Sequence, residues 1–371
     1  MKKILFTLLF LFSSLSIFAQ SLANADFNQG NRHFDAGNYK EAITAYSKSI
    51  YIEPSFAQAY NNRGLAKLEL NDIKGALTDF NKVLSLDPKN AEAYRNRATL
   101  KIRQNDFAGA LTDYDKGLTL SPSDADMYYN RGVAKLNLNR PKEALADFEK
   151  SIKFNPDAPD SYLERAHLRL AANDAAGAIA DYSMVTKKAP TSEVYLFRAQ
   201  AYEKMGKPTE ALADYNNAIG LASNSVGAYF NRSLLRFNQR DYAGCVQDLN
   251  KVISINPRMA EAYANRAMAQ SQLGKTKEAL TDYNKALSLK PNDAANLVER
   301  GGIKMDLKDY TGAIADFSQA ITLNPKLANA YYGRGHSKVL LNQGATACAD
   351  LQKAQQLGSN QAASLLAKTC K

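Results

Sequence analysis

The sequence predicts an all-α protein built as an α-solenoid, which is a stack of antiparallel helix hairpins. Three observations predict it: the 371 residues repeat with a period of 34, each repeat has two runs of helical apolar spacing, and proline closes most repeats. One hairpin cannot bury its own apolar faces, whereas stacked neighbours bury them together. The repeats begin near residues 23, 57, 91, 125, 159, 192, 226, 260, 294 and 328, with one step of 33 residues.

Each repeat is expected to form two helices. In the repeat that begins at residue 57, Tyr60, Gly64 and Lys67 share one face of a first helix, and Ala76 and Phe80 share one face of a second. The Gly64 position is Gly, Ala or Ser in every repeat, and small side chains allow two helices to approach closely. The prolines that end second helices are Pro54, Pro88, Pro122, Pro156, Pro190, Pro257, Pro291 and Pro325.

Composition excludes several classes of protein. Apolar residues make up 45% and charged residues 23%, as in a folded chain and not a disordered one. The three His (33, 167, 336) are widely separated, and the Cys spacing fits no zinc pattern. We therefore expect no enzyme activity, no catalytic residue, no metal and no cofactor. The formal charge is +10, and part of it comes from lysines spread along the second helices without base-stacking aromatics, so we expect no nucleic acid partner. These lysines are Lys82, Lys116, Lys150, Lys251 and Lys285.

The N-terminus has the order of a secretory signal peptide. Lys2 and Lys3 precede an apolar run from Ile4 to Phe12, and Ala19 ends the segment. The alternative is a membrane anchor, but the run is shorter than the roughly 20 residues that a bilayer requires. We expect residues 1–19 to be removed, which leaves no integral membrane segment, and the mature protein to be periplasmic or secreted. The repeats then occupy residues 20–359, and residues 360–371 form a capping helix.

The repeat resembles the tetratricopeptide repeat (TPR) family. The resemblance lies in the 34-residue period with Tyr, Gly or Ala, Ala, Tyr or Phe, and Pro at fixed positions, and it covers ten copies. Asp26 and Leu297 depart from it, because both stand at an aromatic position. The resemblance implies a right-handed superhelix of hairpins, in which the first helices line a concave surface that binds partners.

An arginine and an aspartate recur in nine of the repeats, one on each helix. Both lie about eight residues from the turn, so they stand at similar height in a hairpin. We expect pairs within a repeat, such as Arg131 with Asp147 and Arg266 with Asp282, because pairing between repeats would orphan Arg63 and Asp350. The alternative is that free arginines form an anion-binding stripe. The arginines are Arg63, Arg97, Arg131, Arg165, Arg198, Arg232, Arg266, Arg300 and Arg334.

The resemblance to the TPR family places candidate binding residues on the first helices. An Asn row can pair with a peptide backbone through its amides; apolar residues beside it suit peptide capture. The alternatives are that Asn is common at this position and that the apolar residues only pack repeats together. The row comprises Asn62, Asn96, Asn130, Asn231 and Asn265, and its neighbours are Arg95, Tyr129, Leu136, Phe230 and Phe237.

The C-terminus carries a predicted disulfide. Cys348 and Cys370 lie about 11 residues on either side of the turn at Gly358, so an antiparallel helix pair brings them level. The alternative is two reduced thiols near a frayed end. Cys245 occupies the small position held elsewhere by Ala, and we expect it to be inert packing.

These observations predict an exported, non-catalytic scaffold that binds a protein or extended peptide in its groove. One alternative is a structural subunit of an envelope or secretion assembly that docks through its outer surface or its ends. Another is a carbohydrate- or cell-wall-binding module, because grooves rich in Tyr and Asn can hold sugars.

Overall fold

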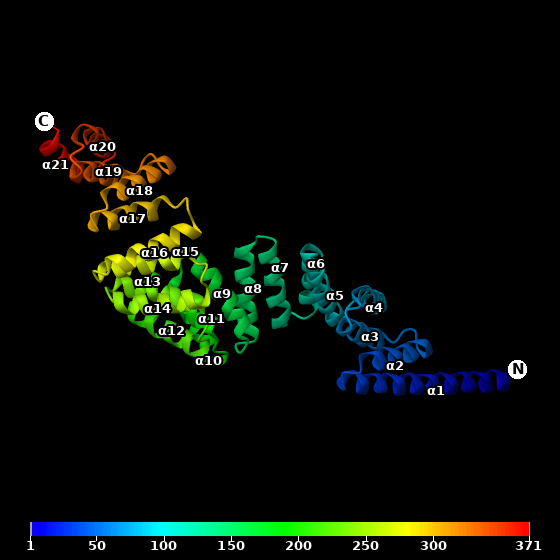
Figure 1. The fold of residues 1–371 in the computed structure, drawn as a ribbon. Helices are drawn as coiled ribbons and strands as arrows, with labels where there is room; N and C mark the ends of the chain where they lie inside the picture. Colours follow the sequence, from blue (N-terminus) through cyan, green and yellow to red (C-terminus); the bar gives the residue numbers. More distant parts are fainter. Residues whose placement is uncertain (1, 371) are drawn as a thin grey trace. The chain divides into compact units, whose positions relative to one another are not determined.

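A computed structural model gives the fold of residues 2–370, with side chains described from residue 18. Over this range the chain forms 21 α-helices and no strand, arranged as successive antiparallel hairpins (Figure 1). The predicted all-α solenoid is confirmed.

From the second repeat onward, each first helix begins at the residue where the sequence repeat starts. The helices of the first five repeats are α1 Lys2–Asp35, α2 Tyr39–Ile52, α3 Ala57–Glu69, α4 Ile73–Leu86, α5 Ala91–Arg103, α6 Phe107–Leu120, α7 Ala125–Asn137, α8 Pro141–Phe154, α9 Pro159–Ala171 and α10 Ala175–Lys188. The others are α11 Ser192–Lys204, α12 Pro208–Leu221, α13 Val226–Asn238, α14 Tyr242–Ile255, α15 Ala260–Gln272, α16 Thr276–Leu289, α17 Ala294–Asp306, α18 Tyr310–Leu323, α19 Ala328–Leu340, α20 Gly344–Gln356 and α21 Asn360–Thr369.

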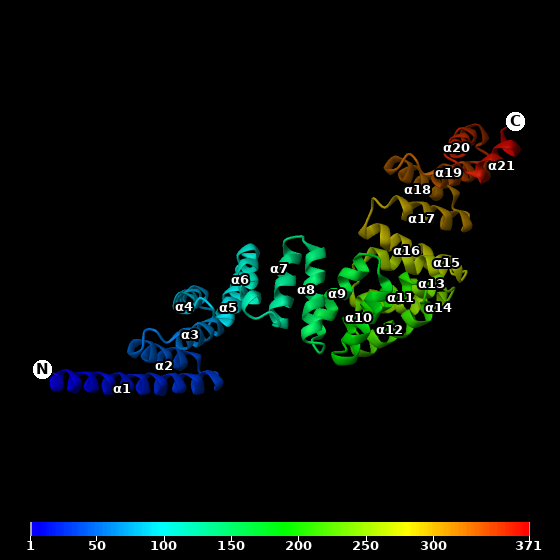
Figure 2. The same cartoon turned by 180° about the vertical axis from the view of Figure 1, so that it is seen from behind.

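The helices group into two units, Met1–Lys188 and Ala189–Lys371. The boundary falls at the single 33-residue step of the sequence. Within each unit, a second helix packs against the first helix of its own hairpin and of the next hairpin. Figures 1 and 2 show this order for α1 to α8 in the first unit and for α17 to α21 in the second.

Small residues pack against aromatic side chains where the two helices of a hairpin meet. A Cβ added to Gly64 would lie 2.8 Å from Cε1 of Phe80, so the ring occupies the space that a side chain would need. Phe80 and Ala76 are fully buried. The glycine is therefore required by the close approach of the aromatic ring.

Every first helix ends in the same left-handed turn. The residue two after each first helix has a positive φ, and the backbone N–H groups there close the helix in a Schellman arrangement: Arg240 donates to Phe237 and Asp241 donates to Arg236, both at 2.9 Å. Asn and Gly tolerate this conformation best. The ten residues are Gly37, Asn71, Asn105, Asn139, Asn173, Gly206, Arg240, Gly274, Lys308 and Asn342.

Substituting Arg240→Gly is expected to stabilise the protein. Arg240 has a φ of 64°, which strains a long L side chain. Relief of that strain, less the greater backbone entropy of glycine in the unfolded chain, should raise the free energy of unfolding by about 0.5–1 kcal/mol. Urea denaturation followed by circular dichroism measures the change. The control is Lys277→Gly inside α16, which should destabilise; a loss of stability in the Arg240 variant would contradict the account.

The predicted signal peptide, residues 1–19, lies almost entirely outside the residues whose side chains the structure describes. Among those that are described, no helix is both long enough and apolar enough to cross a membrane.

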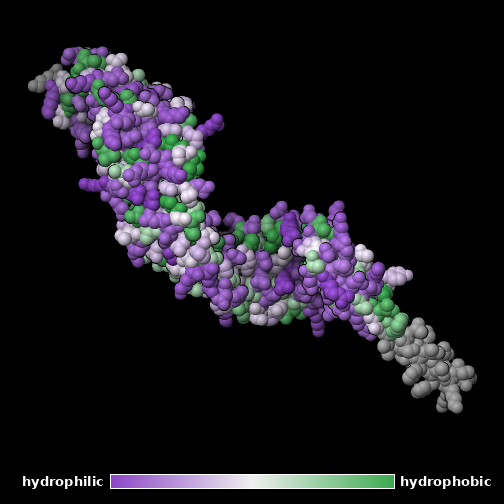
Figure 3. All heavy atoms as spheres, turned by 60° about the horizontal axis from the view of Figure 1, so that its bottom comes forward, coloured by the Kyte–Doolittle hydropathy of each residue, from purple (hydrophilic) through white to green (hydrophobic). Residues whose placement is uncertain are grey.

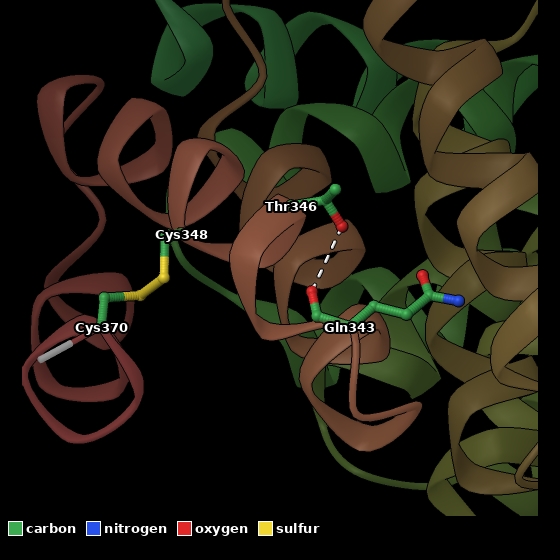
Figure 4. The surroundings of a disulfide bond; sticks show 4 residues. All are labelled: Gln343, Thr346, Cys348 and Cys370. Atoms are coloured by element: carbon green, nitrogen blue, oxygen red, sulfur yellow. Dashed lines mark hydrogen bonds between the residues drawn. A yellow bond between two sulfur atoms is a disulfide. The ribbon is translucent and has the colours of Figure 1, made fainter.

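The last helix closes the apolar end of the second unit. Ala362 of α21 is fully buried against Leu351 and Ala354 of α20. A disulfide joins Cys348 in α20 to Cys370 at the end of α21, with their Cα atoms 5.8 Å apart (Figure 4). The chain thus carries a covalently fastened helix on the last repeat.

Candidate functional site

The arginine–aspartate ladder pairs within repeats. Arg131 donates from Nε and Nη2 to the two carboxylate oxygens of Asp147 at 2.9 and 2.6 Å, and Arg266 makes the same two-pronged contact with Asp282 at 2.7 Å for both bonds. The same pairing recurs in all nine repeats that have the two residues. Each aspartate is at most 5% exposed.

Seven of the ladder arginines also donate to a polar side chain of the preceding repeat. Arg131 Nη1 lies 2.7 Å from Asp115, and Arg266 Nη1 donates to Asn250 at 2.7 Å. The ladder therefore couples neighbouring repeats as well as the two helices of one hairpin.

A second cation completes the ladder in seven repeats, and the sequence analysis did not find it. Lys135, four residues after Arg131, places Nζ 2.6 Å from the second oxygen of Asp147. Its signal in the sequence is a Lys or Arg one helical turn beyond seven of the nine ladder arginines. The seven residues are Lys67, Lys101, Lys135, Arg169, Arg236, Lys304 and Lys338.

The electrostatics of the ladder are those of a structural network. Burial by itself would raise the pKa of Asp113, but hydrogen bonds from Arg97 and Lys101 outweigh it and bring the pKa below its ordinary value. The Asp113 carboxylate thus remains charged and holds Arg97 and Lys101. An anion-binding stripe would need arginines that the ladder aspartates do not occupy.

In the first unit the Asn row is engaged within the protein. Asn62 Nδ2 donates to Asn31 at 2.9 Å, and Asn96 Nδ2 donates to Asn61 at 3.0 Å. Asn130 donates to the carbonyl oxygen of Asp126 in its own helix at 2.9 Å. These amides lie on the first-helix face, but each already has a partner.

The neighbours of the row in this unit are partly buried. Tyr129 packs beside Phe148 with ring centroids 5.9 Å apart, and burial, followed by the charges of Glu164 and Asp160, raises its pKa. Arg95 lies 3.4 Å from Asp124. Leu136 is half-buried.

Three cavities recur at one position of the repeat. Each is bounded by three residues of a first helix, one residue of the following second helix and two residues of the next first helix. The repeat-1 pocket, about 350 Å³, is lined by Asn31, Phe34, Asp35, Tyr46, Asn62 and Leu65. The repeat-6 pocket, about 340 Å³, is lined by Gln200, Glu203, Lys204, Tyr215, Asn231 and Leu234. The repeat-7 pocket, about 200 Å³, is lined by Leu234, Phe237, Asn238, Cys245, Asn265 and Met268.

The pockets bring the Asn row and the apolar candidates together. Asn62, Asn231 and Asn265 each form part of a pocket wall, and Phe237 lines the repeat-7 pocket. Phe230 packs half-buried in the core cluster around Leu249. The sequence analysis missed the position of Leu234 and Met268, whose signal is a large apolar residue one after the small first-helix position.

Hydroxyl groups reach the pockets from the second helices. Tyr46 is buried and donates to Asn31 at 2.9 Å, at the floor of the repeat-1 pocket. Tyr215 is buried beneath the repeat-6 pocket and donates to the carboxylate of Glu203. Each pocket floor in these two repeats is therefore polar at one point.

Metal-ligating side chains do not cluster in the described part of the chain. Between residues 18 and 370, no group of three His, Cys, Asp or Glu side chains is placed to hold a metal ion. On the face drawn in Figure 3, hydrophobic residues lie in small patches among hydrophilic ones.

Comparisons with known proteins identify the repeat. Models of the tetratricopeptide repeat match residues 57–90, 125–158, 163–226, 196–244 and 260–293, and a model described as TPR repeat matches 30–71, 100–139 and 301–344. No curated protein matches the sequence.

Solved structures agree on the fold. The C-terminal part of a TPR repeat-containing protein from Cytophaga hutchinsonii is 18% identical, with a TM-score of 0.56 over 64% of this chain and 98% of that one. The structure of pilF from Pseudomonas aeruginosa is 21% identical, with a TM-score of 0.51 over 57% of this chain and 96% of that one. With the repeat models matching from residue 30 to residue 344, the chain belongs to the tetratricopeptide repeat family, whose solenoids are scaffolds typical of protein–protein interaction.

Proposed function

We propose that the protein is an exported, non-catalytic scaffold that binds a protein or an extended peptide along its first-helix face. The observation that carries the proposal is the recurrence of equivalent pockets, each with an asparagine of the row in its wall. A repeated pocket suits a ligand that repeats at the same interval, and an extended chain is such a ligand.

The chemistry of the pockets suits a peptide. An asparagine amide both donates and accepts, as a peptide unit does, so it can pair with a backbone without reading its sequence. Within the second unit, Asn231 and Asn265 make no hydrogen bond to another side chain of the described residues. Their amides are therefore available to a ligand, in contrast to those of Asn62, Asn96 and Asn130.

The test is partner capture by groove variants. A protein with Asn231→Ala, Phe237→Ala and Asn265→Ala is expected to lose a partner that the unchanged chain captures after cross-linking, while the helical circular dichroism signal is retained. The matched control carries Lys251→Ala and Lys285→Ala on exposed positions of α14 and α16, and it should capture the partner normally. Equal capture by both variants would exclude the groove.

The export part of the proposal rests on the N-terminal segment. The test is the mass of the protein recovered from the exported fraction. This mass should correspond to a chain that begins at residue 20. A full-length protein confined to the cytosol would contradict it.

A second candidate function is docking through the end of the first unit. A cavity of about 600 Å³ lies between Asp26 of α1 and residues of α2, among them Ile43, Lys48 and Tyr51. Asp26 stands where other repeats have a Tyr ring, and Tyr51 is 88% exposed. A structural subunit of an assembly could dock through this cavity. In that case Tyr51→Ser should abolish assembly, whereas the groove variant should assemble normally.

A further inference from the structure

Two of the three pockets are consecutive and share a wall. Leu234 lines both the repeat-6 pocket and the repeat-7 pocket. Their other walls differ, because Glu203 and Lys204 in one are replaced by Phe237 and Asn238 in the next. Two different subsites therefore stand side by side on the first-helix face of the second unit.

The repeat-7 pocket is apolar. Leu234 and Met268 are each 37% exposed, and Phe237 forms another wall. The floor is Cys245, a buried thiol whose pKa burial raises to about 12, so it stays neutral. Leu249 stands at the position of Tyr215 in the repeat-6 pocket, but Cys245 and not Leu249 lines this cavity, so its floor carries no tyrosine hydroxyl. Such a cavity suits a large aliphatic side chain.

The repeat-6 pocket is acidic at its floor. Tyr215 is fully buried, and its hydroxyl donates to the carboxylate of Glu203, which fixes that carboxylate in the pocket. Burial, and then the hydrogen bond to Glu203, raises the pKa of Tyr215, so the hydroxyl remains a donor. Lys204 is exposed at the rim. A cationic side chain that enters this pocket meets a positioned carboxylate.

The charge of the surrounding face favours a cationic ligand. Every arginine of the ladder in this unit is paired with an aspartate, so these cations are neutralised. Outside the ladder, Lys204 is the single Lys or Arg on the four helices α11, α13, α15 and α17. The carboxylates on the same helices are Glu193, Glu203, Glu261, Glu299 and Asp306.

The spacing of the pockets sets the spacing of the ligand. The successive first helices α13 and α15 are in contact, and helices in contact lie about 8–10 Å apart. Three residues of a polyproline II chain span about 9 Å, and residues i and i+3 of such a chain lie on one side. In a β-strand the same two residues would point to opposite sides.

From these observations we propose that the repeat-6 and repeat-7 pockets select an extended, polyproline II-like peptide with a Lys or Arg side chain in the first pocket and a large aliphatic side chain, three residues away, in the second. The proposal rests on the proposed function, because it assigns the ligand chemistry of the same face. The proposed ligand is an extended peptide and not an α-helix.

The test is fluorescence anisotropy of the full chain with labelled peptides that contain Lys-Pro-Pro-Leu or Leu-Pro-Pro-Lys. One of the two orders is expected to bind. Replacing the peptide Leu with Ser should weaken binding at least about tenfold, because an aliphatic side chain leaves its pocket. Replacing the peptide Lys with Gln should weaken it about fivefold.

Variants of the protein locate the two subsites. Met268→Glu should reduce affinity for the parent peptide about tenfold or more. Glu203→Gln, which keeps an acceptor for Tyr215, should weaken the Lys peptide and leave the Gln peptide unchanged. The matched control is Leu65→Glu, the equivalent substitution in the repeat-1 pocket, which should have no effect.

Three results would overturn the proposal: binding of neither peptide, binding that Met268→Glu and Glu203→Gln leave unchanged, and tighter binding of an amphipathic helical peptide with the same Lys and Leu. If neither peptide binds but the groove variant still loses its partner, this ligand is rejected and the groove remains the binding site. Failure in both experiments would reject the groove itself.

Discussion

Replacing Asp147 with alanine is expected to lower the free energy of unfolding by about 3 kcal/mol, because it removes the buried carboxylate that two mostly buried cations share. Asp147 is 2% exposed and accepts from Arg131 and from Lys135 at 2.6 Å each. The side chains of these two cations are only 14% and 12% exposed, so water replaces the lost carboxylate poorly. Equilibrium urea denaturation monitored by circular dichroism measures the loss.

A double-mutant cycle separates the pair from the general effect of truncation. Arg131→Ala combined with Asp147→Ala should cost at least about 1 kcal/mol less than the sum of the two single changes, because the residues are in direct contact. Asp115→Ala is the control, since Asp115 contacts the same arginine but is 63% exposed, and its loss should cost less than about 1 kcal/mol. Strict additivity, or equal losses for Asp115 and Asp147, would refute a structural role for the ladder.

Removing the disulfide by Cys348→Ser with Cys370→Ser is expected to destabilise the C-terminal end by about 3 kcal/mol, the chain-entropy value for a loop of this length. The two cysteines are 22 residues apart in the sequence. Without the bond, α21 is held by Ala362 and by the half-buried Leu365 and Leu366 alone. Hydrogen exchange of the α21 amides, measured with and without reductant, reports this local opening.

The response to reductant provides the control. Exchange in α21 should rise on reduction in the unchanged chain, and also in Cys245→Ala, because Cys245 is a free buried thiol. It should already be high, and insensitive to reductant, in the double serine variant. Identical exchange in the oxidised and reduced protein would show that the bond does not hold the helix.

The sequence was sufficient to predict elements that one repeat contains within itself. Tyr60, Gly64 and Phe80 recur at fixed intervals, so both helices and their close contact follow from periodicity. The pairing of Arg131 with Asp147 also lies inside one hairpin, where distance from the turn determines height. Cys348 and Cys370 are close for the same reason, on either side of a single turn.

Contacts between repeats, and one contact inside the hairpin, could not be predicted in the same way. The position of Asp115, the acceptor for Arg131 in the preceding repeat, holds Asn, Ser or Glu in other repeats, so no single residue type marks it. Lys135 was missed because lysine on a helix surface is usually solvated, and only the packing shows that it reaches Asp147. The division at Lys188 has no residue signal beyond one shortened repeat.

The pockets could not be predicted from the sequence, because they depend on how completely neighbouring side chains fill the space between helices. Leu249 and Tyr215 occupy one position and both are core residues, yet Tyr215 lines its pocket, whereas Cys245 and not Leu249 lines the next one. The Asn row was predicted from repeat position alone, but Asn62 and Asn96 are bound to other asparagines, whereas Asn231 and Asn265 line pockets without such a partner. Availability of an amide is a property of its neighbours and not of its repeat position.

The central claim is that the first-helix face, and not the outer face, meets the partner. Site-specific photo-crosslinking tests it most directly: a photoreactive residue is placed at Asn231 or Met268 on the first helices, and at Lys251 or Lys285 on the second helices, in otherwise unchanged chains. The account predicts one and the same adduct from Asn231 and Met268 and none from Lys251 or Lys285. Adducts from the lysine positions alone would contradict it.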